Sequence, residues 1–113
     1  MDCIFCNIIN GEIPSSKVYE NEKIYAFNDI SPVAPVHVLI IPKEHIESIN
    51  DLTDENASLV SDVLLAARDI AAQLGISESG YRVVTNCGQA AGQTVNHIHF
   101  HLLGGRDLAW PPG

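Results

Sequence analysis

The sequence predicts an α+β domain whose sheet is mostly antiparallel. Its 113 residues suffice for one domain, and 46% of them are hydrophobic against 18% charged, which is enough to build a core. The predicted elements follow the order β-β-β-α-β-β with hairpin-like connections, which is typical of this class. We therefore expect a five-stranded sheet, one long helix and a short N-terminal helix. Residues 1–113 form one domain in this interpretation, with 104–113 as its C-terminal tail.

The first elements are a short helix and a hairpin. Residues 3–9 are apolar enough to form a short helix, and Gly11 is a residue that ends helices. Residues 18–27 contain pieces in which apolar side chains recur at every second position. The polar residues between these pieces predict a hairpin with its turn at Glu20-Asn21.

A loop, a buried strand and the long helix follow. Two prolines make 29–35 a loop, and the β-branched run 36–41, with a proline on each side, predicts a buried strand. Thr53 is a suitable N-cap, and Gly75 is a natural stop after the helix. Between them, apolar residues recur with the period of 3.6 that marks an amphipathic helix: Leu59, Val60, Val63, Leu64, Ala67, Ile70, Ala71 and Leu74.

The C-terminal third predicts two more strands. Residues 81–85 form the first, and a Gly/Ala-rich loop follows at 87–92. Residues 97–103 form the second, which ends at the glycine pair 104–105. The end of the chain, 110–113, is rich in proline and predicts an extended tail.

Three of the five histidines alternate along the last predicted strand, at His97, His99 and His101. Successive side chains of a strand point to opposite faces, so the three imidazoles share one face of the sheet. The intervening residues Ile98, Phe100 and Leu102 share the other face, which can pack on the long helix. We expect the imidazole face to line a surface groove.

Residues 93–103, with the sequence QTVNHIHFHLL, resemble the His-φ-His-φ-His-φ-φ signature of the histidine triad (HIT) superfamily. Residues 29–45 look like the ribose loop and second strand of that family. The ending 104–113, with GGR and WPPG, is similar to the nucleotide-binding Hint branch, which is purine nucleoside phosphoramidase-like. The resemblance covers nearly the whole chain and implies the HIT-like fold.

The resemblance assigns catalytic roles to four histidines. Imidazole is a good nucleophile near neutral pH because its free base is well populated there. The resemblance makes His99 the nucleophile that attacks the α-phosphorus of a nucleotide derivative, giving a nucleotidyl-histidine intermediate that water hydrolyses. It implies that the backbone carbonyl of His97 orients this ring. His101 would help to protonate the leaving group, and His37 would steady His101.

The resemblance also implies a nucleotide site. Gln93 and Thr94, with the backbone around Gly92, can donate to a phosphate without carrying charge. Asn86 matches a further contact on the phosphate side, and Asp29 matches the acid that binds the ribose hydroxyls. The positions that match the apolar base pocket are Phe5, Phe27, Ile30 and Leu39. The chain departs from many Hint proteins at two positions, where Thr94 replaces Ser and Asn96 replaces Tyr.

Cys3 and Cys6 have the spacing of half a zinc site. In a subset of the superfamily, two histidines close a tetrahedral site, and their positions here are His45 and His97. The resemblance therefore implies a structural zinc ion, held by Cys3, Cys6, His45 and His97, that also fixes the backbone of His97. The alternative is a pair of reduced, partly buried cysteines.

The leading functional hypothesis is metal-independent hydrolysis of nucleoside phosphoramidates of the AMP-X type. Hydrolysis of dinucleoside polyphosphates and nucleotidyl transfer are alternatives within the same superfamily. A different chemistry is a metal-dependent hydrolase that uses His97, His99 and His101 as three zinc ligands around an open water position. The remaining alternative is a nucleotide-binding module without catalysis.

The charge balance limits the partners. Acidic residues outnumber basic ones 14 to 6, for a net charge of -8, which argues against nucleic-acid polymers and anionic membranes. A single purine nucleotide remains compatible with this charge, since N–H groups and imidazoles can hold it. The N-terminus lacks a targeting pattern, and an odd number of cysteines, three, is a poor disulfide framework. We therefore expect a soluble, cytoplasmic protein. The resemblance implies a homodimer in which the tail with Trp110 reaches toward the partner.

Overall fold

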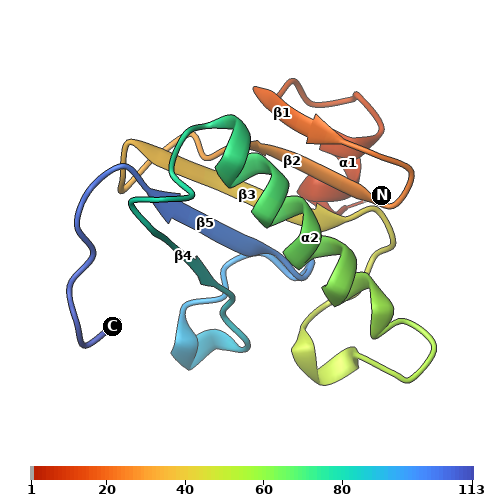
Figure 1. Cartoon of the computed structure of the whole chain (residues 1–113). Helices are drawn as coiled ribbons and strands as arrows, with labels where there is room; N and C mark the ends of the chain where they lie inside the picture. Colours follow the sequence, from red (N-terminus) through yellow and green to blue (C-terminus); the bar gives the residue numbers. More distant parts are fainter. Residues whose placement is uncertain (1) are drawn as a thin grey trace.

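A five-stranded antiparallel sheet carries one helix on each of its faces (Figure 1). The computed structural model describes residues 2–113. Neighbouring strands lie in the order β1-β2-β3-β5-β4, and each pair is antiparallel. This arrangement confirms the predicted fold class. The helices and strands are α1 (Ile4–Ile9), β1 (Lys17–Glu20), β2 (Ile24–Asn28), β3 (Val36–Pro42), α2 (Ser58–Gln73), β4 (Tyr81–Val84) and β5 (Phe100–Gly104), with short 3₁₀ turns η1 (Ile49–Asp51) and η2 (Gln89–Ala91).

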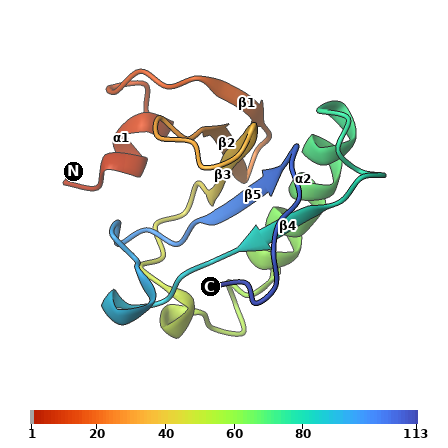
Figure 2. The same cartoon turned by 90° about the vertical axis from the view of Figure 1, so that its left-hand side faces the viewer.

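Each face of the sheet has its own apolar core, because neighbouring residues of a strand point to opposite sides. Figure 2 shows α1 and α2 on opposite sides of the sheet. The larger core lies under α2, and the strands contribute to it Ile24, Ala26, Val38, Ile40, Phe100 and Leu102. The smaller core contains Phe5 and Ile8 of α1, together with Tyr25, Phe27, Leu39 and Ile41. Both faces of β2 and β3 are therefore buried, which explains their nearly unbroken apolar sequences.

The long helix begins later than predicted. We expected it to start after Thr53, but α2 begins at Ser58. The backbone N–H of Thr53 donates to Asn56 Oδ1 at 2.7 Å, and the N–H of Asn56 donates to Thr53 Oγ1 at 3.3 Å. This reciprocal pair caps a turn that precedes the helix. Gly75 ends the helix as predicted, with a φ of 74°. Within residues 2–113, no helix combines the length and apolar composition needed to cross a membrane.

The first hairpin turns slightly later than predicted. We expected the turn at Glu20-Asn21, but β1 includes Glu20 and the chain reverses between Asn21 and Lys23. Asn21 Oδ1 accepts hydrogen bonds from the backbone N–H groups of Lys23 and Ile24, both at 2.9 Å. The side chain of Asn21 thus organises the turn, as Asn does in Asx-turns.

The last strand is shorter than predicted. Strand β5 begins at Phe100, so residues 97–99 lie before it rather than within it. Phe100 pairs with Ile40 at the last position of the β3–β5 ladder. Beyond that point the backbone finds another partner, since the N–H of Ile98 donates to the carbonyl of Ile46 at 2.6 Å. The predicted split of the side chains nevertheless holds, because Ile98, like Phe100, belongs to the core under α2.

Candidate functional site

The imidazoles of residues 97–101 lie on the face of the sheet that carries α1. We expected these imidazoles to line an open groove. They do not, because His97 is 0% and His99 only 6% exposed. Phe5 of α1 covers both rings, with its centroid 5.9 Å from that of His97 and 5.1 Å from that of His99. His101 is half-buried, and its ring centroid lies 5.3 Å from that of His99. The site therefore offers His101 to solvent and keeps His99 shielded.

The ring of His99 is held in one tautomer by the backbone. Its Nδ1 lies 2.7 Å from the carbonyl oxygen of His97. A carbonyl oxygen only accepts, so Nδ1 carries the proton and Nε2 keeps a free lone pair. On the other side, the hydroxyl of Thr85 donates to the carbonyl of His99 at 2.8 Å. The main chain thus fixes both the position and the protonation pattern of a candidate nucleophile.

A chain of hydrogen bonds fixes the tautomer of His101. The backbone N–H of Val33 donates to His37 Nδ1 at 3.1 Å, which leaves the proton of His37 on Nε2. That proton faces His101 Nδ1 at 2.9 Å, while Asp29 Oδ2 lies 3.4 Å from the same nitrogen of His37. His101 accepts through Nδ1 and therefore carries its own proton on Nε2. Burial, followed by the proximity of His99 and His37, lowers the pKa of His101, which favours this neutral form.

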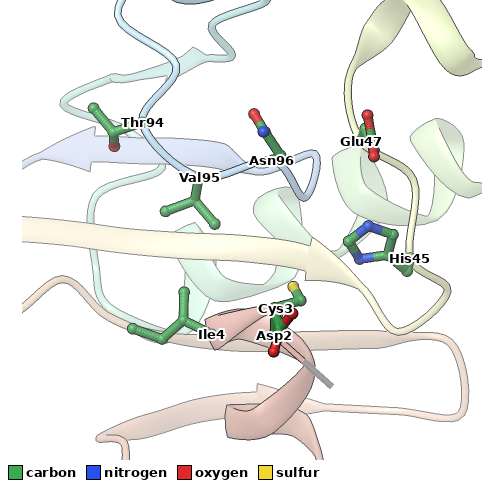
Figure 3. A pocket seen from close by; sticks show the side chains of 8 residues that line it. All are labelled: Asp2, Cys3, Ile4, His45, Glu47, Thr94, Val95 and Asn96. Carbon is green, nitrogen blue, oxygen red and sulfur yellow. The ribbon is translucent and has the colours of Figure 1, made fainter.

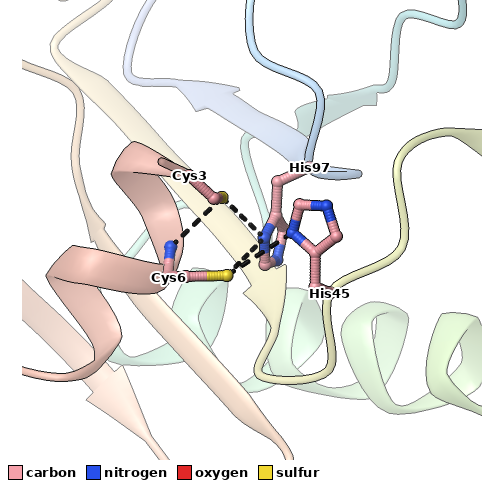
Figure 4. A group of neighbouring side chains, drawn as sticks. All are labelled: Cys3, Cys6, His45 and His97. Carbon is pink, nitrogen blue, oxygen red and sulfur yellow. Dashed lines mark hydrogen bonds between the residues drawn. The ribbon is translucent and has the colours of Figure 1, made fainter. Parts of the chain in front are cut away.

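Two cysteines and two histidines converge beside the start of α1 (Figure 4). Cys3 Sγ lies 3.3 Å from His97 Nδ1, and Cys6 Sγ lies 3.6 Å from the same nitrogen and 3.4 Å from His45 Nδ1. In a tetrahedral zinc site with bonds of about 2.3 Å to sulfur and about 2.0 Å to nitrogen, neighbouring S and N ligands are about 3.5 Å apart. The spacing of the four side chains therefore fits a tetrahedral ion.

The surroundings of this cluster also suit a metal ion. His97 Nε2 donates to the carbonyl of Pro42 at 2.8 Å, so its Nδ1 faces the thiols with a free lone pair. Burial lowers the pKa of His97, which keeps the ring neutral. Burial and the neighbouring Cys3 raise the pKa of the Cys6 thiol to about 11, so a metal ion must displace its proton. Cys3, Cys6 and Cys87 are all free thiols.

A second group of candidate ligands, formed by Asp29, His37 and His101, fits a metal ion poorly. A histidine that binds a metal through one nitrogen normally donates the proton of the other to an acceptor. His37 Nδ1 faces the N–H of Val33, which is a donor. Binding an ion through Nε2 would therefore place two N–H groups against each other. His97 belongs to the cysteine cluster instead, so the histidines of residues 97–101 do not converge on one ion.

The residues expected on the phosphate side lie in the loop that leads into residue 97. Asn86 is close to Gly92, since its Nδ2 lies 3.8 Å from where a Cβ on that glycine would stand. The side chain of Gln93 ties the loop together. Its Nε2 donates to the carbonyls of Glu47 at 2.7 Å and Val95 at 3.0 Å, and its Oε1 accepts from the N–H of Gly88 at 2.9 Å. Both amide hydrogens of Gln93 are therefore engaged within the protein. The backbone N–H groups of Gly92 and Gln93 also donate within the loop, to the carbonyls of Gln89 at 3.0 Å and Gly88 at 3.1 Å, so of the expected phosphate donors Thr94 remains.

The four apolar residues expected around a base separate into two groups. Phe5, Phe27 and Leu39 pack in one buried cluster beside the histidines. Ile30 is 97% exposed and lies outside that cluster, in the loop that carries Asp29. A base that rests on the cluster would gain apolar contact from the first three residues, and from Ile30 only at the rim.

A cavity of about 470 Å³ opens beside the cysteine cluster and shares Cys3 and His45 with it (Figure 3). Thr94, which is exposed, contributes to its wall. The remaining lining residues are Asp2, Ile4, Glu47, Val95 and Asn96. Asn96, one of the two departures from many Hint proteins, therefore lies at the surface of this cavity and not in the core.

Three contributors to the site have no signal in the sequence. Val33 acts through its main-chain N–H, which every residue except proline can supply. Pro42 acts through its main-chain carbonyl, which every residue can supply. Thr85 acts through its hydroxyl, but a single β-branched residue at the end of a strand is most often a packing residue. Only the fold reveals what these groups face.

The sheet, the single long helix and the histidine run together define a protein of the histidine triad class. A profile of the HIT domain matches residues 10–108. The chain therefore belongs to the HIT domain family, as the sequence motifs indicated.

Individual relatives match over nearly the full length. An uncharacterized HIT-like protein of Synechococcus elongatus is 54% identical over 112 residues, covering 99% of this chain and 97% of that protein. A 14 kDa zinc-binding protein of Zea mays is 48% identical over 112 residues, covering 97% and 87%. Among solved structures, a HIT family hydrolase from Legionella pneumophila superposes with a TM-score of 0.97 at 52% identity, covering 99% of this chain and all of that one.

Proposed function

We propose that the protein is a hydrolase of nucleoside phosphoramidates of the AMP-X type, acting through a nucleotidyl-histidine intermediate on His99. The observation that carries this proposal is the 2.7 Å bond from His99 Nδ1 to the carbonyl of His97, which leaves Nε2 as a free base. The similarity to a HIT family hydrolase supports a hydrolytic reaction in general terms.

In the first step, His99 Nε2 attacks the α-phosphorus and the bond from phosphorus to the leaving nitrogen breaks. The leaving amine takes up a proton from solvent, and the Nε2–H of His101 donates a hydrogen bond to the leaving nitrogen. His37 holds the other nitrogen of His101 at 2.9 Å, so the hydrogen that faces the substrate is the one on Nε2. The Nδ1–H bond to the carbonyl of His97 strengthens as the ring of His99 gains positive charge.

In the second step, water attacks the phosphorus and the bond from phosphorus to His99 Nε2 breaks. The water gives its proton to solvent, and the ring of His99 is released with its proton on Nδ1, as before the reaction. Asp29 would accept from the ribose hydroxyls, and the hydroxyl and backbone N–H of Thr94 would donate to the phosphate. The cluster of Phe5, Phe27 and Leu39 would support the base.

We also propose that Cys3, Cys6, His45 and His97 hold one structural zinc ion. The spacing of 3.3 to 3.6 Å between their sulfur and nitrogen atoms supports it, and a relative from Zea mays is a zinc-binding protein. When bound, the ion would cross-link the start of α1 to the segments around residues 45 and 97. All steps of the proposed hydrolysis use side chains and backbone groups of the chain.

We further propose that the chain forms a homodimer. Trp110 is 82% exposed, and the base of its segment is held by Arg82, whose Nη2 donates to the carbonyl of Ala109 at 2.8 Å. A large exposed aromatic residue on such a segment is typical of an interface residue.

Purified protein is expected to release AMP from AMP linked to an amine through a P–N bond. The same protein should cleave a dinucleoside polyphosphate more slowly, because a net charge of -8 disfavours a leaving group that carries several negative charges. We expect a ratio of kcat/KM of at least about 10 in favour of the phosphoramidate. Chromatographic detection of AMP with both substrates measures this ratio, and preferential cleavage of the polyphosphate would contradict the substrate class.

The rate is expected to fall on acidification, by about tenfold per pH unit once His101 binds a second proton. Its pKa is lowered from the usual 6.5, so the fall associated with this residue lies below that pH. A protonated His101 would carry hydrogen on Nδ1, facing the Nε2–H of His37. Because the folded-state pKa is lowered, the neutral ring stabilises the fold above about pH 6.5, and this contribution is lost as the pH decreases through that pKa.

Profiles of kcat/KM and of thermal unfolding between about pH 5 and 8 check both effects. The variant His101→Gln, which cannot titrate, should show a smaller loss of stability over the acidic half of this range. A wild-type rate that stays constant down to about pH 5 would contradict the role of neutral His101.

A further inference from the structure

Arg106, just beyond β5, makes an unusual contact for an exposed arginine. Its Nε and Nη2 both donate to the carbonyl oxygen of Val33, at 3.2 and 3.0 Å, and its Nη1 donates to the carbonyl of Asp107 at 2.9 Å. Hydrogen bonds from an ionised donor are stronger than neutral ones. No carboxylate of the described residues pairs with Arg106. The guanidinium therefore acts as a clamp on the loop of residues 29–35.

The residue next to Arg106 makes an independent contact with the same loop. A Cβ on Gly105 would lie 2.9 Å from Pro35 Cβ, and the φ of Gly105 is 86°. The backbone at Gly105 thus packs directly on the end of the loop, closer than any residue with a side chain could. The side chains of Ile30 and Val33 do not anchor the loop, since they are 97% and 60% exposed, whereas Ala34 is buried.

The clamped residue controls two imidazoles. The N–H of Val33 donates to His37 Nδ1 at 3.1 Å, and the proton of His37 on Nε2 then faces His101 Nδ1 at 2.9 Å. If the N–H of Val33 moves away, His37 Nδ1 loses its donor and can carry the proton itself. His101 would then face a bare nitrogen and would shift its own proton from Nε2 to Nδ1.

We propose that Arg106 is a positioning residue that sets the tautomers of His37 and His101 by holding Val33 in place. The hydrogen bonds of Arg106 go to Val33 and Asp107 and not to the histidines, so it acts through the loop. This inference rests on the proposed function for one point, which is that the Nε2–H of His101 donates a hydrogen bond to the leaving group. The tautomers themselves can be measured without any substrate.

The test uses protein with ¹⁵N-labelled histidine, studied by NMR near pH 8, where ordinary histidines are neutral. In the wild type, Nδ1 of His37 and of His101 should show the shifts of unprotonated nitrogen, and Nε2 those of protonated nitrogen. In Arg106→Met, the two nitrogens of each ring should move toward common, averaged shifts. The kcat for an AMP phosphoramidate should fall about tenfold in the same variant.

Two further variants make the test specific. Arg106→Lys keeps the charge and one donor toward Val33, so its shifts and its kcat should lie between those of the wild type and of Arg106→Met. Arg82→Met is the matched control: Arg82 also donates to carbonyls in the C-terminal tail, those of Leu108 and Ala109, but makes no hydrogen bond to the loop. Its histidine shifts should equal those of the wild type.

Unchanged shifts in Arg106→Met would overturn the inference, whatever the activity of the variant. Averaged shifts with a wild-type kcat would overturn the claim that the clamp serves catalysis. Averaged shifts in Arg82→Met as well would show a general effect of loosening the tail, and would also overturn it. Failure of the proposed function is a separate result, because it would appear as absent turnover of phosphoramidates by the wild type.

Discussion

Replacing the proposed nucleophile should have the largest effect on activity: His99→Ala is expected to lower the turnover of an AMP phosphoramidate by about 10⁴-fold or more. The substitution removes Nε2, the only lone pair that the bond to the carbonyl of His97 leaves free on that ring. Binding of AMP should persist within about tenfold, since Asp29 and Thr94 stay in place. Steady-state kinetics and calorimetric titration with AMP measure the two quantities.

Because His99 is only 6% exposed, removing its ring leaves a cavity, and His99→Asn serves as a second variant closer in size. Both variants should lose turnover and keep binding. The wild type, quenched rapidly in the steady state and digested, should carry an acid-labile adduct with the mass of AMP on the peptide that contains His99. Wild-type rates in either variant, or an adduct on another residue, would refute the assignment of the nucleophile.

The largest effect on stability should follow from Cys6→Ser. We expect this variant to lose stoichiometric zinc and to have a free energy of unfolding lower by about 4 kcal/mol or more. Cys6 is buried, and its Sγ lies 3.4 Å from His45 Nδ1 and 3.6 Å from His97 Nδ1. Solvent therefore cannot take the place of this thiol as a metal ligand. Metal analysis of protein purified without chelator, together with denaturant unfolding, checks both expectations.

Cys87→Ser is the matched control. Cys87 is a free, half-buried thiol outside the cluster. This variant should keep one zinc ion per chain and most of the stability. Wild-type protein without stoichiometric zinc, or a Cys6→Ser variant as stable as Cys87→Ser, would count against the structural metal.

The sequence is most informative where side chains alternate or recur. The alternation of His97, His99 and His101 with apolar residues predicted which side chains share a face, and this holds even though β5 begins only at Phe100. The direction of a side chain depends on extended backbone and not on pairing with a neighbouring strand. The predicted faces are therefore correct although the predicted start of the strand is wrong. The spacing of Cys3 and Cys6 similarly indicated the cluster, because one helical turn brings the two thiols together.

The sequence is least informative about burial and protonation. The expected groove over the histidines fails because Phe5, at the other end of the chain, packs edge-on against two of the rings. The tautomers of His37 and His97 depend on main-chain groups of Val33 and Pro42, and a main-chain group leaves no trace in residue type. Such features follow from tertiary structure, which brings distant backbone segments to one ring.

His97 serves the two halves of the site with different atoms. Its imidazole belongs to the cysteine cluster, whereas its main-chain carbonyl orients His99. A substitution at position 97 therefore removes the metal ligand but not the acceptor, provided that packing keeps the segment in place. In evolutionary terms the proposed metal centre is exchangeable: a lineage that replaced all four ligands with a well-packed apolar cluster would keep the proposed reaction. Position 99 has no such freedom, since the proposed reaction forms and breaks a bond to its side chain.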